Sequence, residues 1–126
     1  DGHVTAAQAA KMLLVTLGYS TDYEGFTGAA WSTNVTILAT QAKLFDGLNL
    51  SPTQVLTRDE AAQMIWNALN AYEVTYTTQT VTDANGQESI KVVREEKVIA
   101  GTTDKLTLIK DKYGIDTPPT EKKTQP

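Results

Sequence analysis

The stretch VTAAQAAKM at residues 4–12 recurs as LTRDEAAQM at residues 56–64, and the similarity continues to Leu17 against Leu69. Each position of the second copy lies 69 − 17 = 52 residues after its counterpart in the first. Self-similarity at one fixed offset indicates copies of a small unit that bury their apolar faces against one another. The repeat therefore decides the expected fold of residues 1–72.

Both copies carry the pattern that opens an α-helix. Thr5 with Gln8, and Thr57 with Glu60, have the spacing of a capping box, so these four residues are predicted to be structural caps. Apolar residues follow at helical spacing, and the first helix is expected to end at Gly18. The predicted apolar stripes are Ala9, Met12, Leu13 and Leu17 in the first copy, and Ala61, Met64 or Ile65, and Leu69 in the second.

A third helix is predicted between the copies, over about residues 29–45. Its apolar residues recur at i, i+4, i+7, i+11 and i+14, which places them on a single stripe. The pair Asp46-Gly47 is expected to end this helix, and a loop then leads to Thr57. The stripe consists of Trp31, Val35, Leu38, Ala42 and Phe45.

This order of features resembles the S-layer homology family. Repeats of that family have a first helix with a tryptophan, a loop with Asp-Gly, and a second helix opened by a Thr-Arg-Ala-Glu motif. Trp31, Asp46-Gly47 and TRDE at residues 57–60 stand here in the same order. The resemblance covers a little over half of the chain, with residues 22–72 as one complete repeat and residues 1–19 as the trailing half of another.

The resemblance implies a function and a site. Repeats of the family form a pseudo-threefold bundle outside the bacterial cell, where they bind a secondary wall polysaccharide that often carries pyruvylated sugars. The motif arginine meets the anionic group of this polymer, and the tryptophan and loop glycine shape the pocket. Carried over, the ligand-binding residues are Arg58, Trp31 and Gly47, whereas the first copy has Ala6 in place of the arginine.

Two of these residues also have ordinary structural explanations. Trp31 begins an apolar stripe, so core packing is an alternative to ligand contact. Arg58 lies in the first turn of its helix, where a cation opposes the helix dipole. It could serve as a forked donor for an anion at the helix N-terminus, or it could pair with a neighbouring carboxylate.

A different pattern begins at Glu73. Val74, Tyr76, Thr78 and Thr80 alternate with other residues in a threonine-rich stretch, which favours a half-buried strand. With the Asn85-Gly86 turn signal and a return strand over residues 89–94, this predicts a β-hairpin. Residues 98–100 are expected to extend the sheet. A short helix is predicted over residues 103–113, closed by Gly114, and residues 116–126 are predicted to be a disordered tail.

The predicted fold is therefore α+β and mainly α, with helical S-layer homology repeats in residues 1–72, and the hairpin and short helix in residues 73–115. The net charge of −4 disfavours nucleic acid, and no apolar run is long enough to span a membrane. There is no cysteine, and no nucleophile–base set or metal cluster stands out, so neither an enzyme nor a cofactor is expected.

The leading function is anchoring to a bacterial cell wall or S-layer through an anionic wall polysaccharide. The alternative is a structural or protein–protein module of an extracellular assembly, with other repeats or surface proteins as partners.

Overall fold

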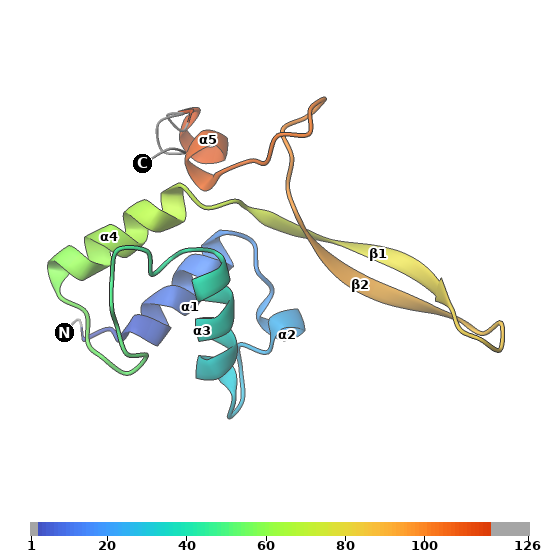
Figure 1. Ribbon diagram of the computed structural model, residues 1–126, viewed down its shortest axis with the longest axis horizontal. Helices are drawn as coiled ribbons and strands as arrows, with labels where there is room; N and C mark the ends of the chain where they lie inside the picture. The colour runs from blue at the N-terminus through green and yellow to red at the C-terminus, as the bar shows by residue number, and fades with distance from the viewer. Residues whose placement is uncertain (1–2, 117–126) are drawn as a thin grey trace.

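A computed structural model describes residues 3–116 of the chain. The fold is mixed α+β and mainly helical: helices come first, then a two-stranded antiparallel hairpin and a short C-terminal helix (Figure 1). The predicted tail lies, apart from Asp116, outside the described residues. The elements are α1 (Ala6–Thr16), α2 (Thr21–Glu24), α3 (Trp31–Gln41), α4 (Arg58–Leu69), β1 (Val74–Thr82), β2 (Glu88–Glu96) and α5 (Leu108–Tyr113).

The two predicted capping boxes are present at the starts of α1 and α4. The Thr5 hydroxyl accepts from the Gln8 amide at 3.2 Å, and the Thr57 hydroxyl accepts from the Glu60 amide at 3.1 Å. The two caps also lie beside each other, because the Leu56 amide donates to Val4 O at 2.9 Å. The repeat copies therefore meet at their helix N-termini, where the loop before α4 supplies acceptors for the first amides of α1.

The two repeat helices bury different faces. In α1 the buried residues are Ala6, Ala7, Ala10 and Leu14, and α3 packs against this helix. Met12, predicted to face inward, is 64 % exposed, so that part of the predicted stripe is wrong. In α4 the buried residues are Met64 and Ala68, whereas Ile65 and Trp66 are exposed. Small alanines on α1 allow the neighbouring helix to approach closely, and this tertiary contact decides which face turns inward.

The helix α3 is shorter than predicted, but its stripe is confirmed. Val35 and Leu38 are buried, and Trp31, Ala42 and Phe45 pack against the core as partly buried residues. The helix ends at Gln41 instead of Phe45, because Lys43 takes a left-handed conformation with φ of 67°. The Leu44 amide then returns to Ala39 O at 2.9 Å, which closes the helix with a Schellman-type turn.

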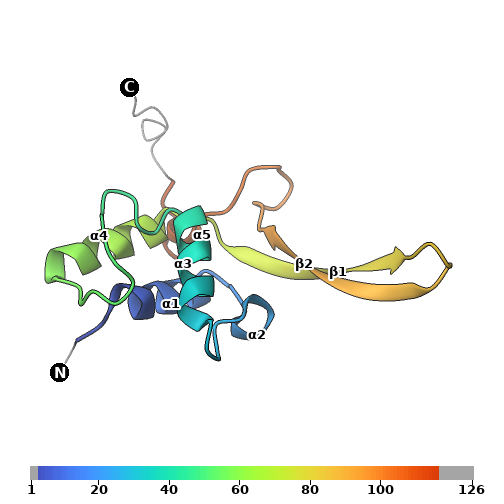
Figure 2. The same cartoon turned by 60° about the horizontal axis from the view of Figure 1, so that its bottom comes forward.

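Beyond the helices, β1 and β2 form an arm that extends away from the helical body in both views (Figures 1 and 2). The predicted turn is confirmed: Gly86 has φ of 81°, and Asp83 Oδ1 accepts from the amides of Asn85 and Gln87. The strands pair in register from Val74 with Glu96 to Thr82 with Glu88.

The chain after β2 differs from the prediction. Val98 forms an isolated bridge with Lys105 instead of extending the sheet, and the Ile99 amide donates to Asp104 O at 2.8 Å. Residues 103–107 are therefore not helical, and α5 begins only at Leu108, capped by the Thr107 hydroxyl. The predicted end at Gly114 is confirmed, with φ of 70°.

A junction of backbone hydrogen bonds, formed by residues 71–74, joins these parts. On one side, the Val74 amide donates to Leu17 O at 2.9 Å, which ties the base of β1 to the end of α1. On the other, the Glu73 amide donates to Leu106 O and the Leu108 amide to Ala71 O, at 2.9 and 3.0 Å. The strand β1 thus begins at a point where α1, α4 and the segment before α5 meet.

The Glu73 carboxylate is buried in this junction. Its Oε1 lies 3.6 Å from Lys97 Nζ and has no hydrogen-bond partner among residues 3–116. Burial raises the pKa of Glu73, and the nearby Asp111 raises it further. The fold therefore favours the protonated form of this side chain, so its charge opposes folding at neutral pH.

The junction requires a glycine at position 18, which packs directly against it. Gly18 has φ of 107°, and a Cβ at this position would lie 2.3 Å from Val74 O. We expect Gly18→Ala to lower the free energy of unfolding by clearly more than the roughly 1–2 kcal/mol of a left-handed residue alone. Gly47→Ala is the control, since Gly47 has φ of 80° and a Cβ there would meet no atom within 4 Å. Urea unfolding followed by tryptophan fluorescence gives both values, and equal losses would contradict the close approach.

Removing the buried charge is expected to stabilise the protein. Because the folded-state pKa of Glu73 is raised, its contribution to stability is present below the unfolded pKa of about 4.3 and is lost as the pH rises through the folded value. Glu73→Gln should therefore unfold at higher urea concentration than the wild type at pH 7, and the difference should shrink on acidification. The exposed Glu96, 3.7 Å from Lys105 Nζ, is the control, and Glu96→Gln should change stability by less than about 1 kcal/mol. A Glu73→Gln variant that is less stable than the wild type at pH 7 would contradict this prediction, because it would show that the Glu73 charge stabilises the folded state.

Candidate functional site

Trp31 lies at the first position of α3 and packs against the core as a partly buried residue. The helix α3 lies across α1 (Figure 1). The Lys11 ammonium lies 5.5 Å from the centre of its ring, within the range of a cation–π interaction. Both residues line an open depression of about 650 Å³. The other lining residues are Val4, Gln8, Met12 and Val15.

The depression combines three kinds of group: apolar surface, a cation and an amide. The indole and the exposed Met12 and Val15 side chains supply apolar surface. Lys11 supplies a cation, and it makes no ion pair with a carboxylate among the described residues. Gln8 adds an amide, although its Oε1 already accepts from the Thr5 amide. An aromatic face beside an unpaired ammonium can bind a ligand that has both an apolar face and a negative charge.

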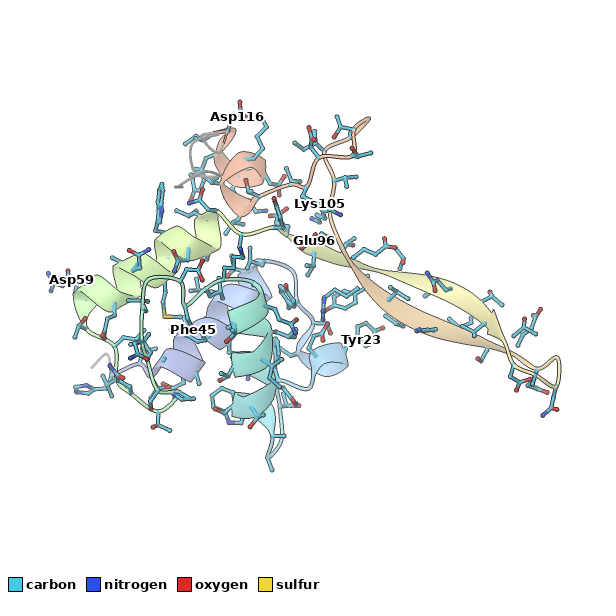
Figure 3. All side chains as sticks on the ribbon, viewed as in Figure 1. Tyr23, Phe45, Asp59, Glu96, Lys105 and Asp116 are labelled. Carbon is cyan, nitrogen blue, oxygen red and sulfur yellow. The ribbon has the colours of Figure 1, made fainter. Side chains whose placement is uncertain are left out.

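Arg58 is the first residue of α4, and its side chain is exposed. It makes no hydrogen bond or ion pair within residues 3–116, so the alternative of a salt bridge to a neighbouring carboxylate is not what the structure shows. In Figure 3 the neighbouring Asp59 marks this end of α4, at the edge of the helical body. The guanidinium is therefore available to a ligand.

An exposed tryptophan shares the face of α4 that carries Arg58. Ala62, Ile65 and Trp66 follow Arg58 at i+4, i+7 and i+8, which places all four on one side of the helix, and all four are exposed. At the repeat offset, Trp66 corresponds to the buried Leu14 of α1. This surface was not predicted from the sequence, because Trp66 was assigned to no apolar stripe. The available signal was that a large tryptophan stands where the other repeat copy has a leucine.

Gly47 shapes a turn and does not accommodate a close contact. It is exposed, its φ is 80°, and no atom lies within 4 Å of the place where a Cβ would stand. The loop that contains it is held on α4 by Asn67, whose Nδ2 donates to Leu44 O and Asp46 O, both at 2.9 Å. Asn67 Oδ1 in turn accepts from Gln63 at 2.9 Å, so this amide is oriented by its own helix.

The three residues that the sequence singled out do not form one site. Neither Arg58 nor Gly47 lines the depression that contains Trp31, and the first turns of α3 and α4 lie apart in both views of the fold (Figures 1 and 2). The cation beside Trp31 is instead Lys11, from the helix of the preceding repeat copy. Lys11 lies over the ring of Trp31, whereas Arg58 and Trp66 lie about two helical turns apart on one face of α4.

A polar cluster that the sequence did not predict holds the hairpin on the helical body. Tyr76 Oη donates to Glu24 Oε2 at 2.7 Å and accepts from the Ser20 amide at 2.8 Å. Arg94 Nη1 also lies 2.7 Å from Glu24 Oε2, and its guanidinium is 5.3 Å from the centre of the Tyr19 ring. Tyr23, labelled in Figure 3, lies on α2 beside the base of the arm, with its ring 5.2 Å from that of Tyr76.

Burial raises the pKa of Tyr76 to about 12, and the hydrogen bond to Glu24 acts in the same direction. Burial also raises the pKa of Tyr19. A phenol with a raised pKa stays protonated and donates to the carboxylate, so it is no general base at neutral pH. The cluster therefore has a structural role: it orients the hairpin relative to α2.

Removing the Tyr76 hydroxyl tests this role. Tyr76→Phe should cost about 1 kcal/mol at pH 7, because the Ser20 amide and the Glu24 carboxylate each lose a partner. The unfolded tyrosine ionises near pH 10, before the folded one, so wild-type stability should fall as the pH rises from about 10 to about 12. Denaturant unfolding at several pH values should show a smaller decline for Tyr76→Phe. The control is Tyr23→Phe, whose hydroxyl has no hydrogen bond in the described part of the chain; if both variants behave alike, the cluster does not anchor the hairpin.

Comparisons with known proteins found no similar protein. No family model, no curated protein and no solved structure matches the chain. Within residues 3–116, no three histidine, aspartate or glutamate side chains come together as metal ligands, and no helix is long and apolar enough to cross a membrane. The depression offers an aromatic ring and the Lys11 ammonium, which makes no ion pair within residues 3–116.

Proposed function

We propose that the chain is a non-catalytic extracellular module of the S-layer homology type that binds an anionic secondary cell-wall polysaccharide. The observation that carries the proposal is the depression in which the Lys11 ammonium, without an ion pair in the described part of the chain, lies over the ring of Trp31. Two capped helices related by a fixed sequence offset support the repeat architecture. The expected location is the cell wall or S-layer of a bacterium.

The depression has suitable chemistry for such a polymer. A sugar ring has an apolar face that packs on an indole, and a pyruvyl or similar substituent adds a carboxylate. Lys11 would form a charge-assisted hydrogen bond with that carboxylate, and the exposed Met12 and Val15 would exclude water around it. Because the chain carries a net charge of −4, an anion would be attracted by these selected cations and not by a general positive field.

Arg58 is proposed as a second anion contact. Its guanidinium is exposed and unpaired within the described residues, and it lies in the first turn of a twelve-residue helix. Neighbouring amides at such a helix start favour negative charge. A long polymer can contact Arg58 and the Lys11–Trp31 depression with different sugar units, so the separation of the two does not conflict with one extended ligand.

A structural or protein–protein role is the second candidate, and the exposed face of α4 favours it. Trp66 is 51 % exposed and Ile65 is 52 % exposed, next to Ala62 on the same side. Exposed large apolar residues that cluster on one helix face commonly mark a contact with another protein. Under this alternative, α4 packs against another repeat or surface protein, and Arg58 forms an ion pair across that contact.

Co-sedimentation of the chain with purified cell-wall sacculi, with and without their secondary polymer, tests the proposal. The chain should pellet only with polymer-bearing sacculi. Lys11→Gln and Trp31→Ala should each weaken pelleting by about tenfold in apparent Kd, which corresponds to about 1.4 kcal/mol. Arg58→Gln should weaken it by a similar factor, whereas Lys91→Gln on the hairpin, which removes the same charge elsewhere, should not.

Each outcome points to one of the two functions or one of the two sites. Lys11→Gln is the decisive variant, because Lys11 is a half-buried side chain that does not belong to the apolar core, so its replacement leaves the core intact. Loss of pelleting in Arg58→Gln alone would place the site on α4. Absence of polymer-dependent pelleting in the wild type would overturn the glycan function. Pelleting that is independent of the polymer but is lost in Trp66→Ser would instead support the protein–protein role.

A further inference from the structure

Within residues 3–116, no strand pairs with either edge of the hairpin arm. The sheet described there consists of β1 and β2, and every residue from Thr77 to Val92 is exposed. The hydrogen bonds from hairpin side chains to the helical body lie at the base, where Tyr76 and Arg94 bond to Glu24. A two-stranded hairpin by itself is marginally stable in water, and a third or fourth strand would stabilise it.

The hydrogen bonds at the two ends of the hairpin show which amides face outward. The Lys97 amide donates to Glu73 O, and the Asp83 amide donates to Gln87 O, both at 2.9 Å. Odd-numbered residues of β1 therefore point toward β2, because the direction alternates along an antiparallel strand. Val74 confirms the parity, since its amide points away from β2 to Leu17 O. The amides and carbonyls of Thr78, Thr80 and Thr82 accordingly lie on the free edge of β1.

The two edges differ in their side chains. β1, with the sequence VTYTTQTVT, has no charged residue, no proline and no glycine. β2, with the sequence ESIKVVREE, carries Glu88, Lys91, Arg94, Glu95 and Glu96. Charged side chains and prolines are the usual means by which natural proteins prevent pairing at an exposed edge. The β2 edge has this protection, and the β1 edge lacks it.

We propose that the free edge of β1 pairs antiparallel with the same edge of a second copy of this chain. The result is a four-stranded sheet with a two-fold axis at its centre, in the order β2, β1, β1 of the second copy and β2 of the second copy. An uncharged strand can face its own copy without like-charge repulsion, whereas two β2 edges would bring carboxylates together. A two-fold contact is also the commonest way in which identical chains associate.

The geometry specifies a register. Val74 is already bonded to Leu17 and cannot pair, so the shared ladder must lie toward the tip of the arm. Placing Thr80 opposite Thr80 of the second copy pairs Thr78 with Thr82 in both directions. Reciprocal N–H···O=C bonds then form at all three threonines, and the threonine side chains form cross-strand pairs, which are favourable in antiparallel sheets. This register also keeps the two helical bodies at opposite ends of the shared sheet.

Sedimentation velocity of the full chain, from micromolar to millimolar concentration, tests the pairing. The wild type should show a concentration-dependent doubling of mass. Thr80→Pro removes an amide on the free edge of β1 without removing a bond between β1 and β2, and it should raise the dimer Kd by at least tenfold. Thr80→Lys, which brings two ammonium groups together at the axis, should do the same.

Ile90→Pro is the matched control. Ile90 is the register partner of Thr80, so the substitution lies at the same distance from the tip, but its amide faces the opposite edge. It should leave the dimer Kd unchanged. Hydrogen exchange measured by NMR should show protection of the Thr78, Thr80 and Thr82 amides that rises with protein concentration. A wild type that remains monomeric at millimolar concentration would overturn the proposal, as would equal weakening by Thr80→Pro and Ile90→Pro. The wall-binding function does not depend on this result, because Lys11 and Trp31 lie on the helical body.

Discussion

The hydrogen bond from the Val74 amide to Leu17 O is the constraint on which the arrangement of the molecule depends. It joins the end of the first repeat helix to the start of the hairpin, which are distant in sequence. Only a glycine at position 18 lets Val74 O approach this closely. Once Val74 is fixed there, its neighbours Glu73 and Ala71 pair with Leu106 and Leu108, and the C-terminal helix is placed as well. These backbone bonds act together with the apolar cluster that contains Leu17, Ala71 and Leu108 to orient the three parts of the chain.

The candidate site follows from a different asymmetry, that between the two repeat helices. They begin with the same capping box, yet α1 turns Ala6, Ala10 and Leu14 inward, whereas the corresponding side of α4 is exposed. The side of α1 that is not buried, with Lys11, Met12 and Val15, forms a depression together with Trp31. In α4, Arg58 makes no ion pair within residues 3–116, and Trp66 is exposed. The two repeat helices therefore place their cations differently: Lys11 lies over the ring of Trp31, whereas Arg58 lies at an exposed helix start.

The features that the sequence predicted are those determined by neighbouring residues. The capping boxes, the stop at Gly18, the α3 stripe and the Asn85-Gly86 turn depend on local hydrogen bonds and periodicity, and all are confirmed. The failures involve distant partners. Residues 103–107 have a helical pattern, but Leu106 instead pairs with Glu73 and Lys97. No periodicity could reveal that Met12 faces outward, or that Glu24 meets Tyr76 and Arg94 across more than fifty residues of sequence. Among the predicted site residues, Trp31 acquired Lys11 as its neighbour through such a tertiary contact.

The closed base of the hairpin also has a mechanical consequence. Since the Lys97 amide is bonded to Glu73 O, tension applied between the helical body and α5 passes across this bond and bypasses the arm. The strands carry no load until the base opens. The residue pairs of β1 and β2 would then separate one after another, starting at the base, at low force. Under such tension the arm would act as stored chain length, which lets the chain lengthen before the helical body itself is strained.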